Sequence, residues 1–131
     1  MSKNKLYNNR GITGIDLTIS IIALTTFTGI IITLMINNYR TSIEIQKSAN
    51  AMSYATIILE KVDEKAYDKV TNDFLKEIQN EINIDSEYEV EFNVTEIENN
   101  DYAKKVDIKV SYTINNQKKQ INIGKLKVKE I

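Results

Sequence analysis

The sequence predicts an α+β fold, in which a long N-terminal helix, its first half transmembrane, precedes a small antiparallel three-stranded sheet. Three observations predict this fold. Twenty consecutive residues from Leu17 to Ile36 carry no charge. From Ile45 onward, apolar residues recur every three or four positions, as they do on one face of a helix. After Asp85 the apolar period falls to two, which is typical of strands with one face on a core.

The composition excludes most kinds of catalytic site. The 131 residues include no His and no Cys, which excludes imidazole triads, thiol nucleophiles, disulfides and His or thiolate metal sites. With no Pro and four Gly, the chain also lacks a phosphate-binding glycine loop. A net charge of −1 argues against a dedicated nucleic-acid binder. These counts do not exclude enzymatic chemistry, but the chain holds few of its usual residues. Our expectation is that the protein is not an enzyme and has no catalytic residue, no cofactor and no metal.

The uncharged run has the length of a membrane span, because twenty helical residues extend about 30 Å. Lys3, Lys5 and Arg10 precede it without any acid, which predicts a single-pass protein with its N-terminus in the cytoplasm. A secretory signal peptide would have a shorter apolar region and a small-residue cleavage site, which Met35–Asn38 does not offer. A buried soluble helix is disfavoured because so short a chain cannot cover twenty apolar positions on all sides.

An acidic residue, Asp16, stands at the start of the run, where by itself it would be a helix cap at the headgroup level. Together, the basic leader, the segment Gly11–Asp16 and the apolar run resemble the N-terminus of type IV prepilins and type II secretion pseudopilins. In that family a peptidase cuts after a glycine, the new N-terminus is methylated, and the fifth mature residue is acidic. This chain has Ile12 where the family has Phe, Gly14 where it has a large apolar residue, and Asp16 where it has Glu.

The resemblance implies three regions. Residues 1–11 would be a leader peptide, cut between Gly11 and Ile12, and Ile12 would be N-methylated. Residues 12–37 would form the transmembrane and filament-core segment. Residues 38–131 would form an extracytoplasmic, pilin-like globular domain.

The resemblance also implies an assembly role for Asp16. Cleavage would remove three of 17 basic residues and leave 14 against 18 acidic ones, a net charge of −4. The new amine on Ile12 and the carboxylate of Asp16 would each be neutralised by its opposite on a neighbouring helix. Buried ion pairs of this kind often add little stability, but they can specify the axial register of neighbouring helices.

The implied function is a structural subunit of a type IV pilus or a type II secretion-like filament, exposed at the cell surface after assembly. Its partners would be other pilin or pseudopilin subunits, a prepilin peptidase and methyltransferase, an ATPase-driven assembly platform, and membrane lipid before assembly. The short three-stranded end resembles the I-type minor pseudopilins. One alternative stays open: an uncleaved, signal-anchored membrane protein with a small extracytoplasmic binding or sensor domain. The two hypotheses differ in whether the chain is cut after Gly11.

The helix is expected to run from about Thr13 to Val62, roughly 75 Å, with half of it in lipid or a filament core and half carrying the domain. A second helical stretch is expected over Glu64–Ile82, either separate or continuous with the first. Apolar residues form an amphipathic stripe on the first helix at Ile45, Ala49, Met52, Thr56, Leu59, Val62 and Ala66, and one face of the second stretch at Tyr67, Val70, Phe74, Ile78 and Ile82.

Three strands are expected, over 88–94, 106–114 and 121–128, with a hairpin turn at 115–117. In the third strand the apolar phase slips near Gly124, which predicts a bulge. Acidic residues of the first strand would pair with lysines of the second.

Two charged clusters have ordinary explanations. The carboxylates of Glu87, Glu89 and Glu91 face Lys109, which favours a solvated surface over a metal site. Lysines near the C-terminus would protect an edge strand from aggregation, and a DNA contact would follow only if the filament served DNA uptake. These lysines are Lys118, Lys119, Lys125, Lys127 and Lys129.

Overall fold

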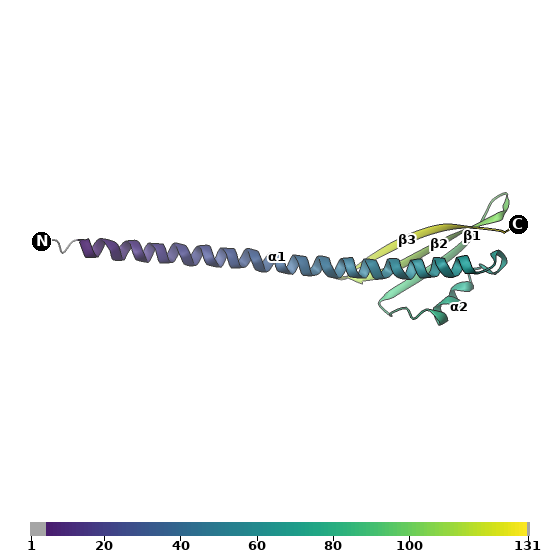
Figure 1. Cartoon of the computed structure of the whole chain (residues 1–131), viewed down its shortest axis with the longest axis horizontal. Helices are drawn as coiled ribbons and strands as arrows, with labels where there is room; N and C mark the ends of the chain where they lie inside the picture. Colours follow the sequence, from purple (N-terminus) through teal and green to yellow (C-terminus); the bar gives the residue numbers. More distant parts are fainter. Residues whose placement is uncertain (1–4, 131) are drawn as a thin grey trace. The chain divides into compact units, whose positions relative to one another are not determined.

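The computed structural model describes the backbone of residues 5–130 and the side chains of residues 13–130 except residue 75. One long helix is followed by a three-stranded antiparallel sheet, which confirms the α+β layout (Figure 1). The chain divides into two compact units after Ser42. The elements are α1 (Lys5–Glu64), the 3₁₀ turn η1 (Tyr67–Lys69), α2 (Phe74–Glu81), β1 (Tyr88–Ile97), β2 (Asn100–Ile114) and β3 (Gln117–Val128).

Helix α1 is longer than expected at both ends and contains 60 residues, about 90 Å of helix. No Pro interrupts it, and Asn37 and Asn38 stay helical. The first four residues of the expected leader lie outside the described residues, as does residue 131 of the expected domain. The backbone of Gly11 and Ile12 belongs to α1, and their side chains lie outside the described ones.

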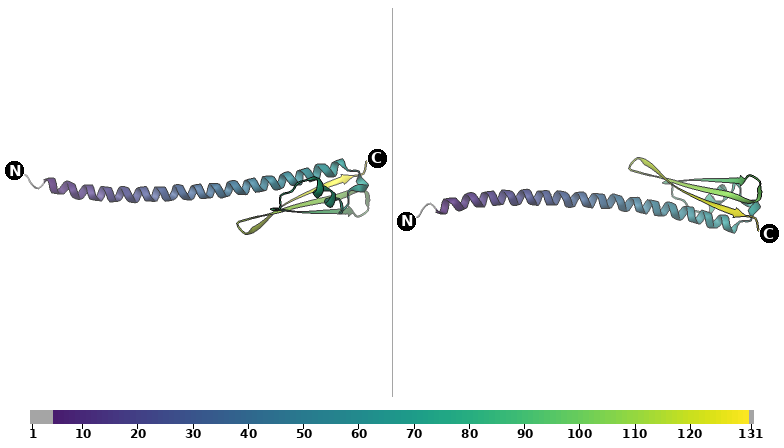
Figure 2. Two further views of the ribbon diagram at one scale, coloured as in Figure 1. Left: turned by 90° about the horizontal axis from the view of Figure 1, so that it is seen from below. Right: turned by 90° about the horizontal axis from the view of Figure 1, so that it is seen from above.

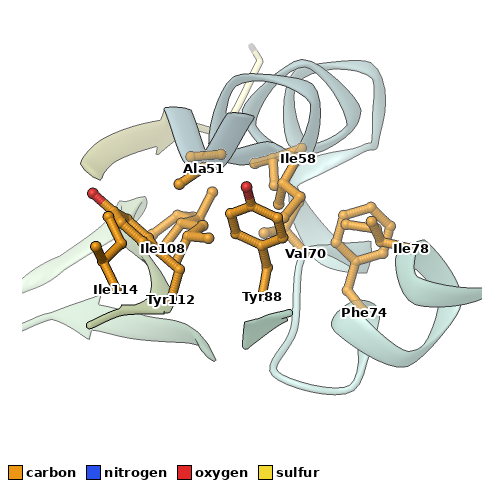
Figure 3. Packing of buried hydrophobic residues seen from close by; sticks show 13 residues of the cluster. Ala51, Ile58, Val70, Phe74, Ile78, Tyr88, Ile108, Tyr112 and Ile114 are labelled. Carbon is orange, nitrogen blue, oxygen red and sulfur yellow. The ribbon is translucent and has the colours of Figure 1, made fainter. Parts of the chain in front are cut away.

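The hydrophobic core lies between the second half of α1 and one face of the sheet (Figure 2). Ala51, Ala55, Ile58 and Val62 of α1 are fully buried, and their spacing of four, three and four residues places them on one helix face. Figure 3 shows Ala51 and Ile58 directed toward Ile108 of the sheet. The sheet and the segment before it add Val70, Phe74, Ile78, Tyr88, Val106, Ile108, Val110, Tyr112 and Ile114.

Only the end of the stripe predicted on α1 packs on the sheet, where Val62 is fully buried and Leu59 lies against the core. Ile45 is 63% exposed and Met52 is 46% exposed, whereas the fully buried residues begin at Ala51. At 100° per residue, the two faces lie about a third of a turn apart. The small side chains of Ala51 and Ala55 let the helix approach the sheet closely, and a search for large apolar residues passes over them.

The expected helix over Glu64–Ile82 is wrong in its first half. Helix α1 ends at Glu64, Ala66 and Val70 have extended backbone, and only Phe74–Glu81 is α-helical. Burial explains the break, because leaving the helix brings Val70 into the core, where it is fully buried. Apolar spacing therefore identified the buried side chains correctly, although the backbone joining them is not one helix.

The three predicted strands are present, and each is longer than expected. The order is β1-β2-β3 with antiparallel neighbours. Ile114 pairs with Gln117 across Asn115 and Asn116, whose φ angles of 50° and 62° confirm the expected turn and fit a type I′ hairpin. A second tight turn, between β1 and β2, has Asn99 at φ 63° and was not predicted.

The bulge expected near Gly124 is wrong. The register of β2 and β3 is regular from Ala103–Val128 to Ile114–Gln117. The alternation continues through Gly124, so Leu126 is exposed on the outer face and Lys127 lies on the side of α1. The last turn of α1 supplies the reason, because Lys127 Nζ donates to the Asp63 carbonyl at 2.8 Å, where a helix end carries unsatisfied carbonyls.

Gly124 has a different structural role from the one predicted. It lies opposite Asp107 in the ladder, and a Cβ at this position would stand 2.8 Å from Oδ1 of Asp107. That carboxylate also pairs with Lys105 at 3.0 Å. The glycine thus leaves room for a charged side chain on the outer face.

Candidate functional site

The first part of α1 presents apolar side chains with nothing covering them. Every described side chain from Thr13 to Ile36 is exposed. Among the described residues, this is the one helix long and apolar enough to cross a membrane, and none of its most apolar stretch is buried. A surface of this kind is stable in lipid or against other apolar helices, and unfavourable in water.

Threonines within the apolar run do not leave unpaired hydroxyl groups. Each of the five donates to the carbonyl four residues before it, so the hydroxyl groups are satisfied inside the helix. In hydrocarbon, where no water is available, this removes most of the cost of carrying them. The bonds are Thr18 to Gly14, Thr25 to Ile21, Thr26 to Ile22, Thr28 to Leu24 and Thr33 to Gly29, with donor–acceptor distances of 2.8–3.0 Å.

Asp16 is exposed on α1, and no ion pair joins it to another described side chain. It lies one turn of helix after Ile12, so a free amine on Ile12 and the carboxylate of Asp16 would lie on the same side of α1. Thr13, Gly14 and Ile15 lie between them in the sequence. The predicted cleavage-site residues Gly11 and Ile12 belong to the backbone of α1, and the structure gives no side-chain environment for them.

A second apolar surface on α1 lies within the folded unit. We name it the exposed α1 stripe, and it consists of Ile45, Ala49, Met52 and Thr56, all exposed. Its spacing of four, three and four residues matches the 3.5-residue repeat by which two helices pack side by side. Helix α1 thus has two apolar faces beyond Ser42, one on the sheet and one open. The stripe predicted from the sequence begins on the open face and reaches the core face only at its end, at Val62.

The acidic cluster around the start of β1 is engaged by lysines. Glu87 pairs with Lys47 at 3.0 Å, and Glu91 pairs with Lys109 at 2.9 Å, as expected for a cross-strand pair. Glu89 binds Lys118, whose hydrogen bond and charge lower the pKa of the Glu89 carboxyl. No group of carboxylates that could hold a metal is found among the described residues.

Three of the five lysines of the basic cluster near the C-terminus are paired with acids. Lys118 contacts Glu89, Lys119 contacts Glu44, and Lys125 contacts Asp63. These contacts neutralise much of the positive charge within the chain, so the cluster differs from the open basic stripe of a nucleic-acid interface.

Comparison with protein-family models, with curated proteins and with solved structures finds no match for this chain. Its function is therefore inferred from its own sequence, fold and exposed surfaces.

Proposed function

We propose that this chain is a membrane-inserted structural subunit of a type IV pilus-like or type II secretion-like filament. In this proposal a prepilin peptidase cuts after Gly11, Ile12 becomes the methylated N-terminus, and the folded unit lies outside the cytoplasm. The single observation that carries the proposal is the exposed α1 stripe, an apolar surface outside the membrane-length segment that the chain's own sheet does not cover.

A simple membrane anchor has no need of that stripe. An anchor requires apolar surface over about 30 Å, which the segment from Leu17 to Ile36 already supplies. Ile45 and Met52 lie beyond it, in the part of α1 whose other face is covered by the chain's own sheet. Helices of neighbouring subunits would bury the membrane segment, and a neighbouring helix would also bury the stripe.

The proposal also gives Asp16 a role. A carboxylate next to an apolar segment is costly away from water, and a positive group on a neighbour offsets this cost. Cleavage after Gly11 would supply such a group, the amine of Ile12, on every subunit. Pairing between neighbours would then fix their axial register.

Mass spectrometry of the protein from its native membrane tests the processing step. The proposal requires an N-methylated chain that begins at Ile12, and the signal-anchor alternative requires an intact leader. Gly11→Val is expected to leave the leader in place, whereas Gly14→Ala, a matched change outside the cut, is expected to be processed normally. An unmethylated full-length wild-type chain would overturn the proposal.

A further inference from the structure

The two outer edges of the sheet differ in how their backbone groups are occupied. In a two-residue hairpin, the closing pair exchanges both backbone hydrogen bonds, and alternate pairs along the ladder do the same. Ile114 and Gln117 close the hairpin, so the even-numbered residues of β3 direct their N–H and C=O groups away from β2. The same alternation continues across β2 into its ladder with β1. The even-numbered residues of β1 therefore also direct their backbone N–H and C=O groups away from β2.

The edge formed by β1 is capped at two positions. The outward N–H of Val94 donates to Oδ1 of Asn72 at 2.7 Å. The outward N–H of Tyr88 donates to the carbonyl of Asp85 at 3.0 Å. Both caps come from the segment between α1 and β1, which closes this edge near each end of the strand.

The edge formed by β3 is open. Among the described residues, no hydrogen bond engages the six outward N–H groups of this strand. The strand is twelve residues long, and none of them is Pro. The outward groups belong to Lys118, Gln120, Asn122, Gly124, Leu126 and Val128.

The lysines of β3 do not protect this edge in the usual way. Lysines that block edge pairing project freely into solvent, whereas Lys119 and Lys125 fold back onto the carboxylates of Glu44 and Asp63 on α1. The centre of the strand, Gln120–Gly124, carries no charge at all. About 16 Å of uncharged edge is left accessible to another strand.

We propose that the outer edge of β3 binds an extended acidic segment of a partner protein as a fourth strand. Backbone hydrogen bonds would supply affinity, as in other cases of strand addition. Charge selects the partner: residues 117–129 include five lysines and no acid, and Glu89, Glu44 and Asp63 pair with three of these lysines. Among the described residues, no carboxylate pairs with Lys127 or Lys129, which leaves net positive charge at this end of β3. The fitting segment has about five uncharged residues, to match the uncharged centre of β3, and an acidic end that meets Lys127 and Lys129. Acidic residues at both ends of a probe serve an added strand of either direction.

Side chains flanking the edge add a second reason for this choice. Leu126 is 57% exposed and Val128 is 58% exposed on the outer face, beside the open backbone groups. Alternate apolar side chains of an added strand would cover them. The proposal concerns the sheet alone, so it holds whether or not the chain is a filament subunit.

Binding of a model peptide to the full-length chain in detergent micelles tests the proposal. The probe is a labelled peptide, EEVTVTVEE, followed by fluorescence anisotropy, and its control is KKVTVTVKK. We expect saturable binding of the acidic peptide and at least about tenfold weaker binding of the basic one. Equal binding of the two peptides, or no binding of the acidic one, would overturn the proposal.

Asn122→Pro separates edge pairing from simple charge attraction. Proline removes an outward N–H that takes no part in the ladder, so β3 is expected to keep its pairing with β2. We expect the affinity for EEVTVTVEE to fall about tenfold or more, and Asn122→Ser, which keeps the N–H, to bind within about twofold of the wild type. Unchanged binding by a folded Asn122→Pro chain would refute strand addition.

Amide hydrogen exchange on the wild-type chain provides a test that needs no variant. Peptide binding is expected to slow exchange at the even-numbered residues of β3 and to leave β1 unchanged. Protection elsewhere, or none on β3, would overturn the proposal. A dimer in micelles that Asn122→Pro dissociates would also overturn it, because the edge would then belong to a second copy.

Discussion

Replacing the two large residues of the exposed α1 stripe should separate assembly from folding. The double variant Ile45→Gln, Met52→Gln keeps good helix-forming residues on α1 while making the stripe polar. Neither side chain belongs to the buried core, since Ile45 is 63% exposed and Met52 is 46% exposed. We therefore expect the folded unit to lose little stability, within about 0.5 kcal/mol per site.

The cost should appear when subunits associate. Fully burying an apolar side chain of this size is worth about 1.5–3 kcal/mol. Scaled by the exposed fractions, about 1–2 kcal/mol remains available at Ile45 and about 0.7–1.4 kcal/mol at Met52. Together these are about 2–3 kcal/mol per subunit, which corresponds to an association about 30- to 150-fold weaker.

The assay compares the amount of this chain in sheared surface filaments, or co-purified with its partners, with the total cleaved protein. Resistance to proteolysis reports the stability of the folded unit. The matched control, Ile45→Leu with Met52→Leu, keeps the stripe apolar and is expected to assemble. Normal assembly of the Gln variant would refute the role of the stripe, and a proteolysed Gln variant would refute its placement outside the core.

Three further predictions concern other parts of the chain. Asp16→Asn should be cleaved normally yet fail to assemble, because the Ile12 amine of a neighbouring subunit would lose its charged partner, and breaking such a buried pair costs about 3–5 kcal/mol. Asp16→Glu keeps the charge and should assemble. Equal assembly of both variants would leave Asp16 as a helix cap. Ile58→Ala should destabilise the folded unit by about 2–5 kcal/mol in thermal unfolding, because this side chain is fully buried; a loss within error of zero would contradict the described core. The lowered pKa of Glu89 contributes stability above its unfolded value of 4.5, and acidification through the lower folded value removes that contribution. Titrated unfolding should show the stability difference between wild type and Glu89→Gln shrinking below pH 4.5, and a constant difference would contradict the pair with Lys118.

Periodicity predicted the elements of this fold better than it predicted their faces. The uncharged run and the alternation after Asp85 identified the long helix and the three strands, because burial on one side forces these periods. The core face of α1 was missed because Ala51 and Ala55 are small and give a weak apolar signal. Their fit against the sheet depends on residues far away in the sequence.

Errors near Gly124 and Glu64 have a similar physical origin. At Gly124 the apolar pattern favours burying Leu126, but the end of α1 provides a carboxylate and a carbonyl for two lysines. After Glu64, helical spacing continues while tertiary packing bends the chain to bury Val70. In both places a contact between segments far apart in the sequence outweighs the local apolar pattern. Such a contact cannot be predicted from the residues around one position.

For the candidate site, sequence alone supplied Gly11, Ile12 and Asp16 through a resemblance, and the structure adds no side-chain geometry that tests the first two. The exposed α1 stripe could be found only with the structure, because exposure depends on which face the sheet covers. The open edge of β3 likewise depends on strand order and on the cap that Asn72 provides at the other edge.

The hydrogen bond from Val94 to Asn72 limits how large an assembly the sheet can build. Propagation by strand pairing requires two open edges per molecule, one to receive and one to offer. A sheet with one uninterrupted edge has a valence of one, so growth through it stops after a single contact. Strand pairing through the sheet therefore gives one contact of fixed stoichiometry, and a polymer of this chain would need a surface other than the sheet edges.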